Sequence, residues 1–241
     1  MNMNFVKKNK NRGFTLLELL IVIAIIAILS VALVLVLNPA ETLKKARDAQ
    51  RISDLATLKT AIGLYLTSVS PAYLGGVADN NFCKPTPATA WGDGSFTYKI
   101  SYSTPIAVPI TDAVEDGSTG VIKRQAAVNP SLTDGTGWIP VKFDNITGGS
   151  PISNIPLDPT NNIVSTLSTA ASVRSDALVY RYACAITPLT FEIDAQLESD
   201  AYTVTDDKRA SDGGNSTLYY EVGTSLSIMT AASPSAVGTD I

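Results

Sequence analysis

The chain has 241 residues, a formal net charge of −4 and a mean hydropathy of +0.17. It contains no histidine, which excludes Ser-His-Asp and Cys-His catalysis and a histidine-ligated zinc site. Its two cysteines, Cys83 and Cys184, are too few for a zinc cluster. Because no spacing singles out a pair of Asp or Glu residues for acid–base chemistry, the sequence predicts a protein that is not an enzyme.

The first strong feature is an apolar run from Phe14 to Leu37, in which Glu18 is the only charged residue. As a helix, this run reaches roughly 36 Å, enough to cross a hydrocarbon core of about 30 Å. A buried core helix is the alternative, but an apolar run of this length is typical of a membrane span. Four basic residues precede the run and should stay in the cytoplasm, with the rest of the chain outside it: Lys7, Lys8, Lys10 and Arg12.

The junction between the basic residues and the apolar run reads Gly13-Phe14-Thr15-Leu16-Leu17-Glu18. The run is too long for a secretory signal, and no A-x-A cleavage site follows it. With its basic leader, this hexapeptide resembles the processing site of type IV pilins and type II secretion pseudopilins. The resemblance implies that prepilin peptidase removes residues 1–13 by cutting between Gly13 and Phe14, and that Phe14 is then N-methylated. Glu18 matches the glutamate at the fifth mature position.

Glu18 needs a physical explanation, because a carboxylate deep in a bilayer costs about 2.5–3.5 kcal/mol. Cleavage after Gly13 would create an amine on Phe14, four residues away. That amine could pair with Glu18 of the same chain or of a neighbouring subunit, and a pairing between subunits would set the register of a filament. Alternatively, Glu18 merely reaches the lipid headgroups.

An amphipathic helix is expected over residues 38–66, with a break at Pro39. Pro39 either kinks a continuous helix or follows an Asn38 N-cap that starts a new one, with Glu41 at the third helical position. Apolar residues recur at steps of three and four and are expected to pack on a globular head: Leu43, Ala46, Ala49, Ile52, Leu55, Leu58, Ile62 and Leu66. The charged residues between them, including Asp48 and Arg51, are expected on a solvated face.

Residues 67–241 are rich in turn formers and β-branched residues and are expected to form an extracytoplasmic head. The fold class is therefore α+β, with the long helix packed on an antiparallel sheet. Expected strands are Phe96–Tyr102, Gly120–Val128, Trp138–Phe143, Leu178–Ala185, Thr190–Leu197 and Leu218–Val222. The run Ile155-Pro156-Leu157-Asp158-Pro159, followed by two of these strands, resembles the loop and hairpin of major pseudopilins.

Two further sites are open on sequence alone. Cys83 and Cys184 form a disulfide, which an exported domain permits, or serve as two small buried residues. Major pseudopilins bind calcium in a C-terminal loop, and the acidic stretch with Asp206, Asp207 and Asp212 is a candidate for the same role. The alternative is a solvated loop, since the spacing matches no EF-hand; no other cofactor is expected.

The leading hypothesis is a structural subunit of a type IV pilus or pilus-like filament, stored in the cytoplasmic membrane and then assembled into a surface or periplasmic filament. The resemblance implies as partners other pilin subunits, prepilin peptidase, an assembly platform protein and a cytoplasmic ATPase. Nucleic acid is not expected, because the basic clusters Lys123-Arg124 and Lys208-Arg209 are short. The alternatives are a type II secretion pseudopilin and a single-pass anchored binding protein that does not polymerise.

Overall fold

The computed structural model describes residues 13–76, 79–89, 98–103, 110–112, 123–124, 129–161, 171–173 and 177–229. The chain divides into two compact units, Met1–Leu43 and Lys44–Ile241. The leader, apart from Gly13, lies outside the described residues, as does most of the expected strand Gly120–Val128.

Two helices form the N-terminal part of the chain: α1 spans Leu16–Leu37 and α2 spans Pro39–Ser68. They are separated at Asn38, which adopts the left-handed conformation with φ 38° and ψ 73°. Asn38 Oδ1 accepts a hydrogen bond from the backbone N–H of Glu41 at 3.4 Å, and Pro39 occupies the first position of α2. A proline suits that position because its missing N–H would have no partner there. The break is therefore a helix stop followed by a capped restart.

The head is built on a five-stranded sheet with the order β3-β1-β5-β6-β7. The strands are β1 (Ile100–Tyr102), β3 (Lys123–Arg124), β5 (Tyr180–Ala185), β6 (Thr190–Gln196) and β7 (Tyr219–Gly223). Strands β1, β5, β6 and β7 pair in antiparallel fashion, which confirms the α+β fold class, whereas β3 runs parallel to β1. A separate parallel pair joins β2 (Ile110–Asp112) to β4 (Ala171–Val173). Two short helical turns complete the described elements, a 3-10 helix at Phe143–Asn145 and a π-helix at Ala201–Thr205.

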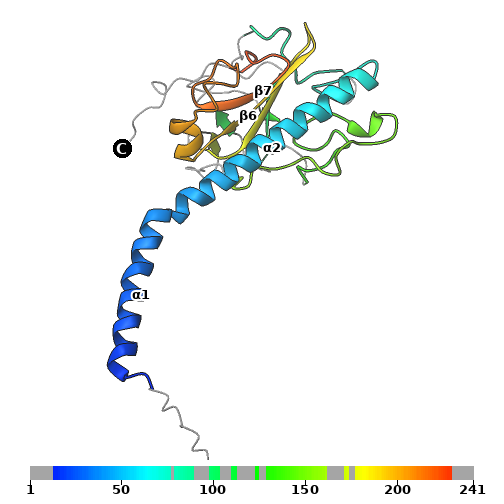
Figure 1. Cartoon of the computed structure of the whole chain (residues 1–241). Coiled ribbons are helices and arrows are strands. Elements are labelled where there is room, and N and C mark those ends of the chain that lie inside the picture. The colour runs from blue at the N-terminus through cyan, green and yellow to red at the C-terminus, as the bar shows by residue number, and fades with distance from the viewer. Residues whose placement is uncertain are drawn as a thin grey trace, which may run out of the picture. The chain divides into compact units, whose positions relative to one another are not determined.

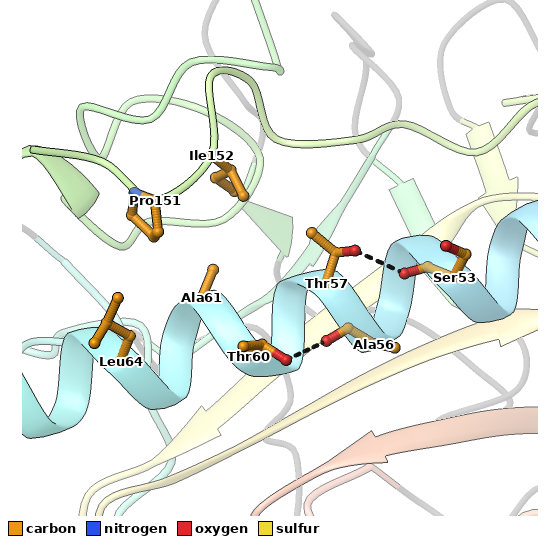
Figure 2. Close-up of a pocket in the computed structure, with 8 residues that line it drawn as sticks. All are labelled: Ser53, Ala56, Thr57, Thr60, Ala61, Leu64, Pro151 and Ile152. Atoms are coloured by element: carbon orange, nitrogen blue, oxygen red, sulfur yellow. Dashed lines mark hydrogen bonds between the residues drawn. The ribbon is translucent and has the colours of Figure 1, made fainter.

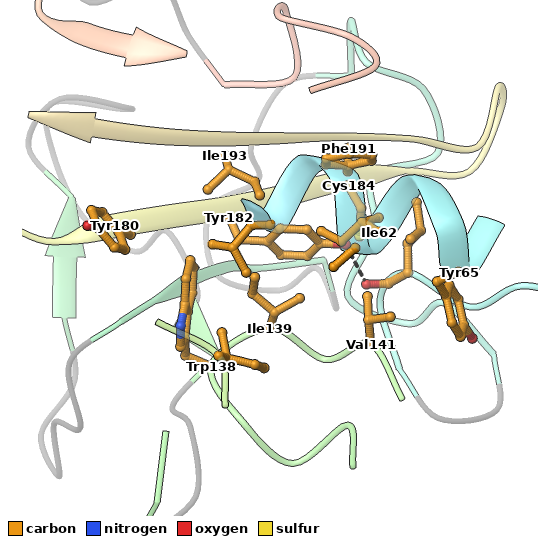
Figure 3. Packing of buried hydrophobic residues seen from close by; sticks show 14 of the residues in the cluster. Ile62, Tyr65, Trp138, Ile139, Val141, Tyr180, Tyr182, Cys184, Phe191 and Ile193 are labelled. Carbon is orange, nitrogen blue, oxygen red and sulfur yellow. Dashed lines mark hydrogen bonds between the residues drawn. The ribbon is translucent and has the colours of Figure 1, made fainter. Parts of the chain in front are cut away.

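The main hydrophobic core lies between α2 and one face of the sheet (Figures 1 and 3). Alternate residues of β5 and β6 point to this face, since side chains along a strand alternate between its two sides. The fully buried side chains of the cluster include Leu55, Leu58, Ile62 and Tyr65 from α2 and Tyr180, Tyr182, Phe191 and Ile193 from the sheet. Tyr182 also donates a hydrogen bond to the carbonyl oxygen of Leu74 at 2.8 Å.

The prediction of a strand at Trp138–Phe143 is wrong. The segment is irregular, with an isolated bridge at Lys142 and the 3-10 turn at its end. Trp138, Ile139 and Val141 are all fully buried in the main core, so the segment lacks the alternation of a half-buried strand. Pro140 lacks the N–H that a ladder needs. The Trp138 indole N–H donates to the carbonyl oxygen of Pro156 at 2.9 Å, which fixes this layer to the following loop.

The opposite face of the sheet carries a second, smaller cluster. It contains Ala183 and Ala185 of β5, which alternate with the core residues of that strand, and Ile100 and Tyr102 of β1. Ile228 and Met229, which follow β7, belong to this cluster and are each about as buried as the core residues. The sheet is thus covered on both faces, by α2 on one side and in part by the chain after β7 on the other.

Cys83 and Cys184 form a disulfide that links the chain after α2 to β5. The backbone reinforces this connection, because the N–H of Lys84 donates to the carbonyl oxygen of Cys184 at 2.8 Å. The two cysteines are 101 residues apart in sequence. The bridge therefore closes a long loop in the unfolded chain.

Replacing both cysteines by alanine should lower the free energy of unfolding by about 2–5 kcal/mol, because a long loop is released in the unfolded state. Urea unfolding followed by tryptophan fluorescence measures the change. Treating the wild-type protein with reductant should reproduce it, and the double variant should be insensitive to reductant. Equal stability of the oxidised and reduced wild-type protein would contradict a stabilising bridge.

Candidate functional site

The segment around Gly13 is open. Among the residues that the structure describes, a Cβ atom placed on Gly13 would meet no heavy atom within 4 Å, and the Phe14 side chain is 79% exposed. The fold therefore gives no steric reason for a glycine at this position. The expected cleavage bond between Gly13 and Phe14 lies just before α1, in residues without regular secondary structure.

Glu18 lies in the first turn of α1, and its side chain is exposed. Its backbone N–H donates to Thr15 Oγ1 at 3.2 Å, so that Thr15 is the N-cap of the helix. The spacing Thr15-Leu16-Leu17-Glu18 is that of a capping box, a signal that is readable in the sequence. A carboxylate in the first turn also interacts favourably with the helix dipole. Thr15 and the backbone of Glu18 therefore form the start of α1, and the Glu18 carboxylate is exposed.

The surface of α1 is apolar on every side. Its described large hydrophobic side chains are between 47% and 83% exposed. The window Leu16–Leu33 has a mean hydropathy of 3.0 and is long enough and apolar enough to span a membrane. Ser30 satisfies its hydroxyl within the helix, by donating to the carbonyl oxygen of Ile26 at 2.7 Å. A helix that is apolar all round needs lipid or other protein around it.

The expected pattern of burial on α2 is wrong in its first half. Leu43 is 60% exposed, and Ala46 and Ala49 are also exposed. Asp48 and Arg51, which were expected on a solvated face, are instead fully buried. The buried positions of α2 include 48, 51, 55, 58, 62 and 65, which alternate in steps of three and four. The period was visible in the sequence, but its first two members are charged.

Arg51 is the centre of a network of ion pairs. Its Nε and Nη2 donate to the two carboxylate oxygens of Asp158 at 2.7 and 3.0 Å. Its Nη1 donates to Asp48 Oδ1 at 2.8 Å and to Glu198 Oε1 at 2.7 Å. Asp48 in turn accepts the backbone N–H groups of Glu198 and Ser199. The network therefore joins α2 to the loop before residue 161 and to the chain after β6.

The network shifts the pKa values of its members. Burial alone would lower the pKa of the Arg51 guanidinium, but the hydrogen bonds that it donates to Asp158, Glu198 and Asp48 outweigh this effect, so that the pKa is raised overall. Hydrogen bonds from Arg47, and then from Arg51, lower the pKa of Glu198 to about 2 despite partial burial. Arg51 and Glu198 are therefore both charged at neutral pH.

A different face of α2 borders an open groove lined by small side chains (Figure 2). The lining includes Ala56, Thr57 and Thr60 of the helix and Pro151 and Ile152 from a loop opposite. The hydroxyls of Thr57 and Thr60 donate to carbonyl oxygens one turn earlier, each at 2.9 Å. Because the hydroxyls of Thr57 and Thr60 bond the helix itself, the groove presents a mainly apolar surface.

The three aspartates proposed for calcium have separate partners. Asp206 pairs with Lys208, and Asp207 pairs with Arg209. Asp212 accepts the backbone N–H groups of Gly214 and Glu221, each at 2.8 Å. Across the part of the chain that the structure describes, no three His, Cys, Asp or Glu side chains gather as a metal-binding group. The structure therefore does not bring the three carboxylates together, and calcium binding stays a prediction.

Replacing Arg51 by alanine should lower the free energy of unfolding by about 3–5 kcal/mol, because Asp48 and Asp158 would be left as buried charges without a cation. Arg51→Lys should cost less, since it keeps the charge but loses the planar fork that binds Asp158. Chemical unfolding measures both. Lys59→Ala, a substitution of an exposed residue on the same helix, is the control, and its free energy of unfolding should stay within about 0.5 kcal/mol of the wild-type value. An equal loss of stability in Arg51→Ala and Lys59→Ala would refute the role of the network.

Glu198 should make the head sensitive to acid. Its pKa is lowered in the folded state, so its contribution is complete above the ordinary value of about 4.5 and is lost as pH falls towards about 2. The melting temperature of the wild-type protein should fall across this window. Glu198→Gln should melt lower near neutral pH and show a shallower fall, whereas parallel melting curves would argue against the assignment.

Residues 8–34 match the family model described as the prokaryotic N-terminal methylation motif. The matched range contains Gly13, Phe14 and Glu18 and most of α1, and it ends before the head begins. No curated protein and no solved structure matches the chain. Its N-terminal segment, with an exposed glycine, a capped first turn and an apolar helix, therefore bears the signature of type IV pilins and pseudopilins.

Proposed function

We propose that the chain is a structural subunit of a type IV pilus or pilus-like filament. It would be inserted in the membrane as a precursor, cleaved by prepilin peptidase between Gly13 and Phe14, N-methylated on Phe14 and polymerised through α1. The observation that carries this proposal is the methylation motif over residues 8–34, at the start of a helix whose apolar surface is exposed.

The surroundings of Gly13 support recognition by another protein. A glycine is required in a fold where a positive φ or a close neighbour forbids a Cβ atom. No heavy atom of residues 13–76 or of the other described parts of the chain lies within 4 Å of the position that a Cβ would take at Gly13. The requirement for glycine is therefore expected to come from the peptidase, whose active site must approach the scissile bond closely.

The chemistry of α1 supports assembly through this helix. Lipid tails are as apolar as the side chains of α1, so that helix association must rely on packing and polar contacts. Glu18 is the one charged residue of α1 and can supply such a contact. Cleavage after Gly13 creates a cationic amine on Phe14, which would pair with Glu18 of its own chain or of a neighbouring subunit.

The alternative within the same class is a type II secretion pseudopilin. In the structure the loop with Asp158 is bound to Arg51, and the strands β5 and β6 that follow it lie in the middle of the sheet. This arrangement fits the loop and hairpin by which residues 155–197 resemble major pseudopilins. Both alternatives share the same processing and the same assembly helix.

The processing step makes a first test. The form purified from membranes of a host with prepilin peptidase should begin at Phe14 and carry one N-methyl group, as measured by intact-mass and N-terminal analysis. The four basic residues of the leader would then be absent, which takes the formal net charge of the chain from −4 to −8. A mature protein that still begins at Met1 would refute the proposal.

In the same host, Glu18→Ala should be cleaved normally but should form few or no filaments in electron microscopy, because the polar contact between subunits is lost. Glu41→Ala is a matched control, since Glu41 also lies three residues after the N-cap of its helix. This control should assemble. Normal filaments from Glu18→Ala would remove the proposed role of Glu18, and cleavage without any filament from the wild-type chain would favour a membrane-anchored protein that does not polymerise.

A further inference from the structure

Strand β7 lies at one edge of the five-stranded sheet that the structure describes. Just after β7, the backbone N–H of Thr224 donates to the carbonyl oxygen of Phe191 at 3.0 Å, towards β6. Alternate residues of an antiparallel strand direct their backbone groups to the same side, so those of Tyr219 and Glu221 point away from β6. These outward groups form the row to which a further strand could be added.

Two side chains of the preceding loop occupy this outward row. Asp212 Oδ2 accepts the backbone N–H of Glu221 at 2.8 Å, and Ser216 Oγ accepts the backbone N–H of Tyr219 at 3.2 Å. Both are donors that a neighbouring strand would otherwise use. The segment Asp212–Ser216, here called the edge loop, therefore takes the place of a strand beside β7.

Further contacts hold the edge loop against the strand. The other oxygen of the Asp212 carboxylate, Oδ1, accepts the backbone N–H of Gly214 at 2.8 Å. In the opposite direction, Glu221 Oε2 accepts the backbone N–H of Ser216 at 2.9 Å, and both of these residues are buried. A Cβ atom on Gly214 would lie 1.8 Å from Glu221 Oε2, so a glycine is needed for this close approach. Loop and strand thus bind each other reciprocally.

The sequence of β7 favours pairing with another strand. Tyr219, Tyr220 and Val222 are of the residue types that are enriched in strands. An open edge of this kind is a template for another chain, and natural sheets protect such edges with charges or covering loops. Two copies of one edge can pair about a two-fold axis, because each offers the same groups to the other. The partner that an open β7 fits is therefore β7 of a second copy.

We propose that the edge loop Asp212–Ser216 closes a strand-addition surface on β7, whose partner would be β7 of a second copy of this chain. While the loop is in place, heads do not join through their sheets, and contacts between copies are left to α1. This consequence for assembly rests on the proposed function, whereas the closure of β7 does not.

A labelled peptide with the sequence of residues 218–224 tests the closure. The full-length protein is held in detergent micelles, with detergent in excess so that most micelles contain one chain, and peptide binding is measured by fluorescence anisotropy. Asp212→Ala should bind the peptide at least about tenfold more tightly than the wild-type protein, because the N–H of Glu221 loses its carboxylate partner. Asp212→Asn should stay close to wild type, since its amide oxygen can still accept that N–H.

Two controls show whether binding is strand addition at this edge. Asp206→Ala removes a nearby carboxylate that pairs with Lys208 outside the edge loop, and it should behave as the wild-type protein. A peptide with proline in place of Glu221 lacks a central N–H and should bind neither form. A folded Asp212→Ala protein that binds no more peptide than Asp206→Ala would overturn the proposal.

Amide hydrogen exchange of the wild-type protein, resolved by residue with NMR in the same micelles, gives a test that needs no variant to fold. The outward N–H groups of Tyr219 and Glu221 should be protected, as should those of Tyr220 and Val222, which face β6. Exchange of Tyr219 and Glu221 at the rate of unprotected amides would show an open edge and refute the closure. Neither measurement depends on cleavage at Gly13 or on filament formation, so the closure and the proposed function can fail separately.

Discussion

The burial of Arg51 is the constraint on which the arrangement of the head depends. A guanidinium without water must be matched by anions in good geometry, or its burial costs several kcal/mol. The anions come from three parts of the chain: Asp48 of α2 itself, Asp158 of a loop and Glu198 after β6. Because all three must meet one planar group, the rotation of α2 and the paths of the two other segments are fixed together.

That rotation determines what the rest of α2 does. With Asp48 and Arg51 turned inward, the positions one, two and three turns after Arg51 on the same side are Leu55, Leu58 and Ile62, which form the core with the sheet. The opposite side keeps Ala56, Thr57 and Thr60 beside the open groove. Burial of Asp48 and Arg51 therefore sets the rotation of α2, with Leu55, Leu58 and Ile62 facing the core and Ala56, Thr57 and Thr60 facing the groove.

The sheet separates two chemical environments. On the side of α2, β5 and β6 contribute aromatic and aliphatic side chains and the disulfide at Cys184. On the other side, the same strands contribute Arg181, Asp194 and Glu192, together with small alanines. Period-two alternation makes both possible within one strand, and it explains why β5 and β6 are buried along nearly their whole length. α1, in contrast, contains no such division, and its uniform apolar surface suits lipid or the helices of other subunits.

The sequence by itself determined the features that depend on neighbours along the chain. The membrane-length run, the break at Asn38-Pro39 and the strands β5, β6 and β7 are all readable from local pattern, since each depends on residues a few positions apart. The burial of the charged residues of α2 and the irregular conformation of Trp138–Phe143 were decided only by the tertiary structure. Asp48 and Arg51 resemble surface residues until Asp158 and Glu198 are brought to them, and Trp138–Phe143 resembles a strand until its consecutive residues are buried in one core. Asp194 and Glu221 are 27 positions apart and lie opposite each other only because β6 pairs with β7. Whether a charge is solvated, paired or protonated depends on what surrounds it in space, and that information is not contained in its own stretch of sequence.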